Sequence, residues 1–574
     1  MSWSSSYLSS PKYGYDIVVG VTQASINATM KLYLSKLKQP VVSVCYVADD
    51  NGSPTLIDYK ELLSRANNSD PFKIPADADP DTNPDIQNLT AAGFMAGFQA
   101  RVGLPPGYDP RHIPDLVVLG SDTSAVTFNM LCSQFDIVEN KPKGGFVKHG
   151  VWNRMSQPSG AAWIIQSKVD LRMSPVASSA YNSLPENVQM AIKNIGADAF
   201  SVQQLLFDLS NAQLQSIPNI IGVTPGPGVY QMLQDYFMSA YFTEMAKEGQ
   251  PVLGVTVTHK NGNWQEPSLK ISNLNLQVSP YVGSDGQPVP NPSADQQRLA
   301  TLNYLCATDG HNLPAAVPFS WNWIESNEQG DYHGVAVTKR ETLANYFEQT
   351  LTQHALANCY KPDVTVVYCD GLMVCFDIHM PPGKSLKVTK PASGATVLSL
   401  SYNSRDDLDG KISYDEAGLN GASGWAKGWS TYSLDLSFSG STIVVRQHLN
   451  VHYEASNFIE TAGGEAVDKT ITSTYPLAMT ADGGLTLGTP TTKTDDNATL
   501  QHASGAAQFF TNLNNILDHV VDKARSLVAP ALDALPLSIG QNYVFPGGNT
   551  FAFKSVAFSD NGDLVTHITY VDPS

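Results

Sequence analysis

The sequence predicts an α+β fold in which curved antiparallel sheets wrap around long amphipathic helices. Three segments carry apolar residues at helical spacing, around residues 26–37, 343–355 and 509–528. Residues 385–500 instead alternate between polar and apolar positions, as antiparallel strands do. Only 15% of the 574 residues are charged whereas 42% are hydrophobic. A strand-rich wall whose polar faces carry Ser, Thr and Asn would have this composition.

The net charge limits the partners of the chain. Lysine and arginine number 35 against 53 aspartates and glutamates, which gives a net charge of −18. Nucleic-acid binding needs a basic footprint, so we expect no nucleic-acid partner. Contact with an anionic membrane is at most peripheral and must come from a local basic patch.

The first elements are a strand, a helix and a second strand. Residues 16–22 are β-prone, and Thr22 is placed to cap a helix of about four turns. The apolar stripe of this helix comprises Ile26, Met30, Tyr33, Leu34 and Leu37. A second strand over residues 42–47 then runs into a turn at Asp50-Asn-Gly52.

Nearly the same order returns in the second half of the chain. A strand at residues 335–338 leads into Thr338-x-x-Glu341, which predicts a capping box. The stripe that follows comprises Leu343, Phe347, Leu351 and Ala355. A strand at 364–369 and an Asp370-Gly371 turn come next. Duplication and chance agreement of common elements both account for this order.

The C-terminal part is predicted to be a β-meander followed by the longest helix. The meander spans 385–500, and the helix spans 505–529 with Pro530 after its end. Its stripe includes Phe509, Leu513 and Leu517. Two strands at 550–558 and 564–570 close the chain. We divide the chain into an N-terminal half, 1–330, and a C-terminal half, 331–574.

The six cysteines are predicted to be reduced thiols, mostly buried. None belongs to a C-x-x-C pair, and six in 574 residues is too few for a disulfide scaffold. A two-residue hairpin at Asp370-Gly371 places Cys369 opposite Leu372, and Cys375 opposite Val366. These two thiols are therefore not expected to be partners.

Two segments invite a metal interpretation, and we predict no metal at either. Residues 405–416 resemble an EF-hand loop, but Arg405 occupies the first ligand position. A solvated acidic turn is the better interpretation. His448 and His452 lie on an alternating strand, where four residues span roughly 13 Å. One zinc ion cannot be reached from both.

No catalytic motif is present in the sequence, and we predict neither catalytic residues nor a cofactor. No G-x-S-x-G elbow occurs, and Gly226-Pro-Gly228 lacks the lysine of a phosphate loop. Catalytic groups can also assemble from distant residues, so an enzyme remains an alternative.

A basic stretch offers candidate contacts for a lipid head group: Lys141, Lys143, Lys148 and Arg154. Phe146 and Trp152 are interleaved with these cations, which suits an interfacial contact. An ordinary solvated loop is the favoured interpretation of this stretch, and the head-group contact is the alternative.

Three segments together resemble the P-47 and OrfX accessory proteins of clostridial toxin gene clusters. They are Tyr13-Gly-Tyr-Asp-Ile17, Pro318-Phe-Ser-Trp-Asn-Trp-Ile-Glu325, and Phe545-Pro-Gly-Gly-Asn-Thr-Phe-Ala-Phe-Lys554 with Asp560-Asn-Gly-Asp-Leu564. In that family a tryptophan usually stands where this chain has Tyr15. The resemblance implies a tubular lipid-binding (TULIP) fold, elongated, with an apolar groove suited to a lipid tail.

The resemblance implies a non-enzymatic protein that binds a lipid or another long apolar ligand. Candidate groove residues come from the three stripes: Ile26, Met30, Tyr33, Leu34, Leu343, Phe347, Leu351, Phe509, Leu513 and Leu517. For any single one of these residues, a place in a filled core is the favoured interpretation. An accessory role, with toxin-complex proteins as partners, is a second hypothesis. No signal peptide is visible, so we expect a cytoplasmic protein, or one released without a classical signal.

Overall fold

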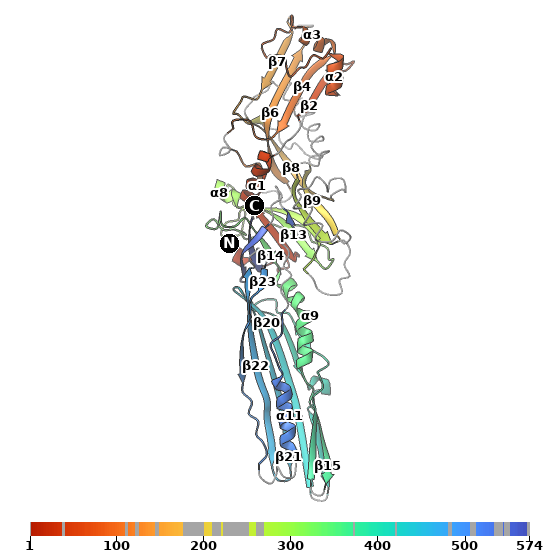
Figure 1. The fold of residues 1–574 in the computed structure, drawn as a ribbon, viewed down its shortest axis with the longest axis vertical. Coiled ribbons are helices and arrows are strands. Elements are labelled where there is room, and N and C mark those ends of the chain that lie inside the picture. The colour runs from red at the N-terminus through yellow and green to blue at the C-terminus, as the bar shows by residue number, and fades with distance from the viewer. Residues whose placement is uncertain are drawn as a thin grey trace.

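A computed structural model describes residues 2–36, 41–108, 113–120, 125–143, 149–175, 200–208, 220–221, 252–259, 269–370, 373–419, 422–479, 485–504, 512–532, 543–544 and 551–570. The molecule is elongated, with sheets stacked end to end along its length (Figure 1). None of the described helices is long and apolar enough to cross a bilayer.

A six-stranded antiparallel sheet occupies the middle of the molecule. Its order is β12-β13-β1-β14-β27-β26. The strands are β1 (Ile17–Thr22), β12 (Ile271–Ser279), β13 (Thr301–Thr308), β14 (Gly334–Thr338), β26 (Phe551–Phe558) and β27 (Leu564–Tyr570). Strands β1, β13 and β14 are buried throughout, as their near-continuous apolar sequences require. β1 and β14 pair antiparallel at the centre, so the helices that follow them leave the sheet toward opposite ends.

The N-terminal end is an eleven-stranded sheet whose main path runs β25-β11-β9-β8-β6-β4-β2-β3. Its strands are β2 (Val42–Ala48), β3 (Pro54–Ile57), β4 (Phe94–Val102), β5 (Val117–Leu119), β6 (Ala125–Lys141), β7 (Val151–Ser156), β8 (Trp163–Pro175), β9 (Phe200–Asp208), β10 (Ile220–Ile221), β11 (Val252–His259) and β25 (Tyr543–Val544). Helices α2 (Tyr59–Arg65) and α3 (Pro84–Ala91) bury Leu62, Ile86 and Leu89 in a separate apolar cluster beside β2, β4 and β7. Helix α8 (Ala294–Arg298) precedes β13.

The C-terminal end is an eight-stranded sheet with order β17-β18-β20-β21-β22-β23, to which β19 and β24 add. Its strands are β17 (Lys387–Thr389), β18 (Thr396–Asn403), β19 (Ser413–Leu419), β20 (Ala422–Ser439), β21 (Thr442–Asn457), β22 (Thr461–Met479), β23 (Leu485–Leu487) and β24 (Thr491–Asp496). A hairpin of β15 (Asp363–Asp370) and β16 (Met373–His379) lies beside it. Helices α9 (Arg340–Asn358) and α11 (Leu513–Arg525) lie along this sheet (Figure 1).

The α+β prediction is wrong, because the fold is largely β. Of the residues that the structure describes, 47% lie in strands and 15% in helices. The longest strands, β20 and β22, have 18 and 19 residues, whereas α11 has only 13. The three predicted stripes correspond to α1, α9 and α11, and these helices together contain far fewer residues than the strands. Antiparallel sheets are therefore the bulk of the fold.

The helix α1 (Gln23–Lys36) begins where the sequence predicts. The start of α9 is capped by a residue other than the predicted one. Thr22 Oγ1 accepts a hydrogen bond from Ser25 N at 3.2 Å, so the predicted cap of α1 is confirmed. The predicted Thr338 capping box of α9 is wrong, because α9 begins at Arg340 and Lys339 caps it without a side-chain bond. The Oδ1 of Asp563 instead accepts from Arg340 N at 3.0 Å.

The third helix differs from its predicted bounds of 505–529. Helix α11 ends at Arg525, four residues early, and residues 505–511 lie outside the described part of the chain. The apolar positions after Arg525 belong to an extended segment, in which Leu527 is buried without helical structure. Val528, the next position of the predicted stripe, is 63% exposed.

The cysteine prediction is wrong at one hairpin, because Cys369 and Cys375 form a disulfide. The ladder pairs Val367 with Cys375 and Tyr368 with Val374, then shifts so that Asp370 faces Met373. Cys369 is the extra residue of this β-bulge. It therefore lies diagonally across from Cys375, with a Cα–Cα distance of 5.7 Å. The other four cysteines form no disulfide and are buried, as predicted.

Candidate ligand-binding pocket

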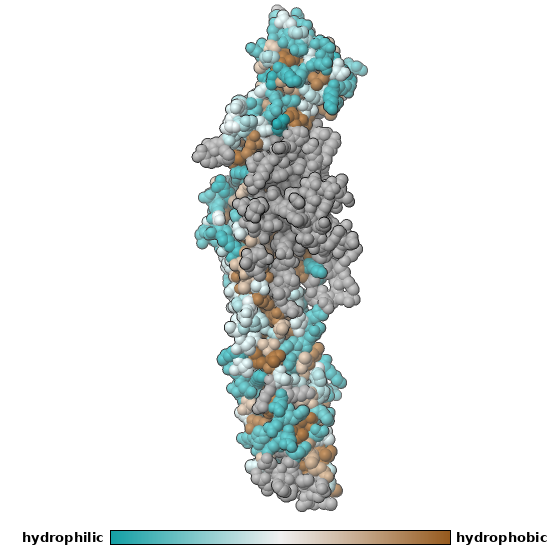
Figure 2. All heavy atoms as spheres, viewed as in Figure 1, coloured by the Kyte–Doolittle hydropathy of each residue, from teal (hydrophilic) through white to brown (hydrophobic). Residues whose placement is uncertain are grey.

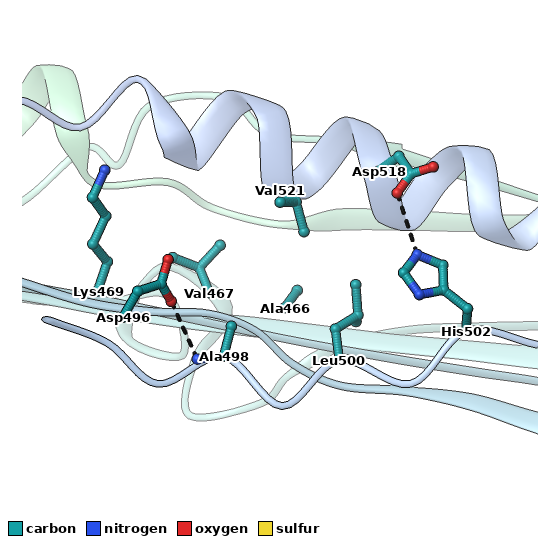
Figure 3. Close-up of a pocket in the computed structure, with 9 residues that line it drawn as sticks. All are labelled: Ala466, Val467, Lys469, Asp496, Ala498, Leu500, His502, Asp518 and Val521. Atoms are coloured by element: carbon teal, nitrogen blue, oxygen red, sulfur yellow. Dashed lines mark hydrogen bonds and ion pairs between the residues drawn. The ribbon is translucent and has the colours of Figure 1, made fainter.

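A pocket of about 360 Å3 lies between α11 and the sheet at the C-terminal end (Figure 3). Its walls come from β22, from β24 and the segment after it, and from one face of α11. The lining residues are Ala466, Val467, Lys469, Asp496, Ala498, Leu500, His502, Asp518 and Val521. The volume is at the lower end of the range for small-molecule sites.

The middle of the pocket is apolar and its two ends are polar. Ala466 and Val467 are buried on the sheet side, and Leu500 and Val521 lie between the polar groups (Figure 3). At one end His502 Nε2 and Asp518 Oδ1 are 3.2 Å apart. At the other end lie Lys469 and Asp496. This order of groups suits a ligand with an apolar body and polar termini.

A β-bulge on β22 creates the apolar floor. The register between β21 and β22 pairs Val451 with Val467 and then His452 with Glu465, which leaves Ala466 unpaired. Strand residues normally alternate between two faces, but a bulge places two neighbours on the same side. Ala466 and Val467 are consequently both buried, at 1% and 4% exposure.

Two asparagines hold the start of α11 in place. The side chain of Asn512 accepts from Phe376 N at 3.0 Å and donates to Phe376 O at 2.8 Å, which ties it to β16. The side chain of Asn514 makes the same pair of bonds with Ala503, at 3.0 and 3.1 Å. The start of the helix is therefore bonded to β16 through Asn512 and to the segment after β24 through Asn514.

The segment after α11 is held by three side chains of the sheet. Lys469 Nζ donates to Leu527 O at 3.2 Å, and Gln447 Nε2 donates to Val528 O at 2.6 Å. Tyr475 donates to Pro530 O. With both ends fixed, α11 keeps its distance from the sheet, and the pocket is preformed.

Two neighbouring faces of helix α11 have different surroundings. Leu517 and Val520 are fully buried in the main hydrophobic cluster, whereas Asp518 and Val521 face the pocket. The strongly exposed side of the helix carries Asn515 and His519. The helix thus closes the core with one stripe and lines the pocket with the next.

Of the predicted groove residues whose side chains the structure describes, none lines this pocket. Ile26, Leu343, Phe347, Leu351 and Leu517 are buried in the main hydrophobic cluster, with exposures of 3% or less. Met30, Tyr33, Leu34 and Leu513 lie in helices α1 and α11, but their side chains are outside the described part, as is Phe509. Whether any of them contacts a ligand stays a prediction.

The predicted basic stretch is distributed over the hairpin of β6 and β7. Lys141 pairs with Glu139 at 2.8 Å, and Arg154 pairs with Asp136 at 3.1 Å. Arg154 also donates to Ile74 O at 3.0 Å. Lys143 is exposed, and Lys148 lies outside the described residues. The head-group assignment stays a prediction, and two of its four cations have carboxylate partners.

The segments considered for metals have other hydrogen-bond partners. His448 pairs with Asp468 at 2.7 Å, and His452 pairs with Glu465 at 3.1 Å while stacking on Trp429. In the turn at 405–416, Asp407 accepts from Tyr402 OH at 2.8 Å. No group of three or more metal-ligating side chains occurs within the described ranges.

The pocket could not have been located from the sequence. Its residues come from four segments. The apolar ones are small or medium-sized side chains that form no motif in the sequence: Ala466, Val467, Ala498, Leu500 and Val521. The one local signal is Val521 in the helical stripe. The bulge at Ala466 breaks the alternation that would have assigned its face.

The fold and the pocket define an elongated, largely β protein in which helix α11 lies along a long sheet and forms one wall of a small open pocket. No protein-family model matches the sequence, and no curated protein matches it. Two solved structures of P47 are similar, from Clostridium botulinum E1 (TM-score 0.42, 10% identity, 97% of this chain and 98% of that chain) and A2 (TM-score 0.40, 10% identity, 97% of each).

A lipopolysaccharide binding protein is also similar, with a TM-score of 0.22 and 9% identity over 97% of this chain and 100% of that chain. The two P47 structures agree with the resemblance to the P-47 family that the sequence motifs indicate. With TM-scores below 0.5, these similarities carry nothing further about function.

Proposed function

We propose that this chain is a non-enzymatic protein that binds a lipid or another amphipathic apolar ligand, with the pocket under α11 as the binding site. The observation that carries the proposal is the preformed pocket, with buried Ala466 and Val467 on its floor and charged groups at both ends. Burial of an alkyl group there is favourable by roughly 0.8 kcal/mol per methylene.

The polar ends of the pocket would orient the ligand. Lys469, which donates to Leu527 O, lies at one end together with Asp496. The His502–Asp518 pair lies at the opposite end, with side chains 46% and 67% exposed. A ligand with polar groups at both ends would therefore place its apolar body along Val467 and Leu500.

The sequence resemblance to the P-47 and OrfX proteins supports the same proposal, because the TULIP fold that it implies is a lipid-binding fold. An accessory role in a toxin complex and an enzyme acting in the cavity remain the alternatives stated from the sequence. No observation on the described residues favours either over ligand binding.

Filling the pocket tests the proposal. Val521→Trp would occupy the space between Val467 and Leu500, and we expect at least a tenfold loss of affinity for a fluorescent fatty acid. Asn515→Trp, on the exposed side of α11, is the matched control and should bind as the unmodified protein does. Displacement titrations give both affinities, and native mass spectrometry reports any co-purified ligand.

Two results would contradict the proposal. One is a protein that purifies empty and takes up no lipid or fatty acid. The other is uptake that Val521→Trp leaves unchanged, because the ligand would then bind elsewhere in the molecule.

A further inference from the structure

The β15–β16 hairpin forms a two-stranded sheet of its own in the described part of the chain. Side chains of β19 and its start join it to the large sheet beside it. Ser413 Oγ accepts from Val364 N at 3.0 Å, and Asp415 Oδ2 accepts from Val366 N at 2.8 Å. Because two strands alone are only marginally stable, the hairpin depends on these bonds, on its buried inner side chains and on its disulfide.

The disulfide lies on the open side of the hairpin. Cys369 is exposed and Cys375 is half-buried. The residues before Cys369 are uncovered as well, with Val367 47% and Tyr368 37% exposed. Figure 2 shows hydrophobic surface toward this end of the molecule, where β15 lies in Figure 1. A thiol in solution can therefore reach the disulfide, and exposed disulfides are the ones that exchange readily.

The residue after Cys375 holds the start of α11. Phe376 N donates to Asn512 Oδ1 at 3.0 Å, and Asn512 Nδ2 donates to Phe376 O at 2.8 Å. Helix α11 begins at the next residue of the chain, and its Asp518 and Val521 line the pocket (Figure 3). The Asn512 side chain thus connects the disulfide-closed strand β16 to the helical wall of the pocket.

We infer that thiol–disulfide exchange at Cys369–Cys375 regulates the pocket, which binds its ligand tightly only while the disulfide is closed. This inference rests on the proposed function, because a pocket must bind a ligand for its affinity to be regulated. With the disulfide closed, β16 holds Asn512 and the start of α11 in place. With the disulfide open, β16 is less ordered, and ligand binding must also order the helical wall.

A dithiol reductant supplies the electrons for this exchange. One of its thiolates attacks the sulfur of Cys369, the more exposed cysteine, and forms a mixed disulfide. The bond between the two cysteine sulfurs breaks, and Cys375 leaves as a thiolate that takes up a proton. The second thiol of the reductant then displaces Cys369 in the same way. The protein gains two electrons and two protons, and the reductant becomes a cyclic disulfide.

Hydrogen exchange and fatty-acid titration, each with and without dithiothreitol, test the inference. Reduction should raise hydrogen exchange in the first turns of α11 by about tenfold, and weaken the affinity for a fluorescent fatty acid by about threefold or more. Thiol labelling counts the cysteines that have been reduced. The double variant Cys369→Ser with Cys375→Ser should resemble the reduced protein in both measurements, whether or not dithiothreitol is present.

Asn512→Ala tests the connection between the hairpin and the helix. This variant keeps the disulfide but loses both bonds to Phe376. Its α11 should exchange rapidly at the start in either redox state, whereas β15 should still respond to dithiothreitol. Its fatty-acid affinity should be lowered and should no longer change on reduction.

Two results would overturn the inference. One is a reduced protein, verified by thiol labelling, whose α11 exchange and fatty-acid affinity equal those of the oxidised protein. The other is a double serine variant that responds to dithiothreitol as the unmodified protein does. Failure of the proposed function looks different, because α11 exchange would then rise on reduction although neither redox state takes up fatty acid.

Discussion

A single buried histidine makes the central sheet sensitive to pH. His567 stacks on Tyr332 with ring centroids 4.4 Å apart, and its Nδ1 lies 3.0 Å from Ser555 Oγ. Burial lowers the pKa of His567 to about 4. Between pH 6.5 and 4 the unfolded chain therefore binds a proton that the folded chain excludes. The contribution of His567 to stability is complete above pH 6.5 and is lost as the pH falls toward 4.

Replacement of His567 by phenylalanine tests this effect. Between pH 7.5 and 5.0, we expect the unmodified protein to lose about 2 kcal/mol more unfolding free energy than His567→Phe. Loss of the Ser555 hydrogen bond is a constant offset that does not depend on pH. Urea titrations at the two pH values give the difference, and equal losses in both proteins would rule out His567 as the sensor.

At the scale of single residues, the sequence predicts a helix-capping hydrogen bond when the two partners are close in the chain. The Thr22 cap of α1 needs only Ser25, three residues away, and was predicted correctly. The cap of α9 was missed because Asp563 lies 223 residues from Arg340. Asp563 also accepts from Ser6 Oγ and Leu8 N, both at 2.7 Å, which no local pattern indicates.

At the scale of elements, strand positions were predictable and register was not. The alternation of residues 442–454 appears in β21, whose buried positions alternate as predicted. The hairpin register was wrong at Cys369, and the pocket floor was missed at Ala466, because each site contains a bulge. A bulge depends on contacts with a neighbouring strand, so a single-strand pattern cannot reveal it.

The β15–β16 hairpin should depend on its disulfide. Cys369 and Cys375 are only six positions apart in the sequence, so the bridge contributes about 2 kcal/mol by restricting the open hairpin. Cys369→Ser with Cys375→Ser should therefore raise hydrogen exchange in β15 and β16 by one order of magnitude or more, and leave β20 and β21 unchanged. A reductant should do the same to the unmodified protein and nothing to the variant. Unchanged exchange in β15 would contradict this role.

At the scale of the whole molecule, the central sheet joins the two predicted halves. Strands β12, β13 and β1 come from residues 1–330, and β14, β27 and β26 come from residues 331–574. The two halves meet at the β1–β14 pair. The division of the chain at residue 330 did not include a prediction that these two strands are neighbours. Strand β25 also crosses to the N-terminal sheet, where it pairs with β11.

Separate expression of the two halves tests this joint. Each fragment alone would leave a buried strand, β1 or β14, as an open sheet edge, so we expect both to aggregate. Co-expressed fragments 1–330 and 331–574 should purify as a 1:1 complex. Fragments that are each monomeric and soluble alone would show that the central sheet is not required for either half.

The placement of β1 also has a cost during synthesis. Its two neighbours, β13 and β14, follow it by about 280 and 310 residues. A ribosome adding roughly 5–20 residues per second needs about 14 to 60 s to produce them. For that time Ile17-Val-Val-Gly-Val-Thr22 is an apolar strand with no partner, next to a nascent chain that is mostly β-prone. During that time β1 can pair only with strands other than its native neighbours, so the late synthesis of β13 and β14 delays completion of the central sheet.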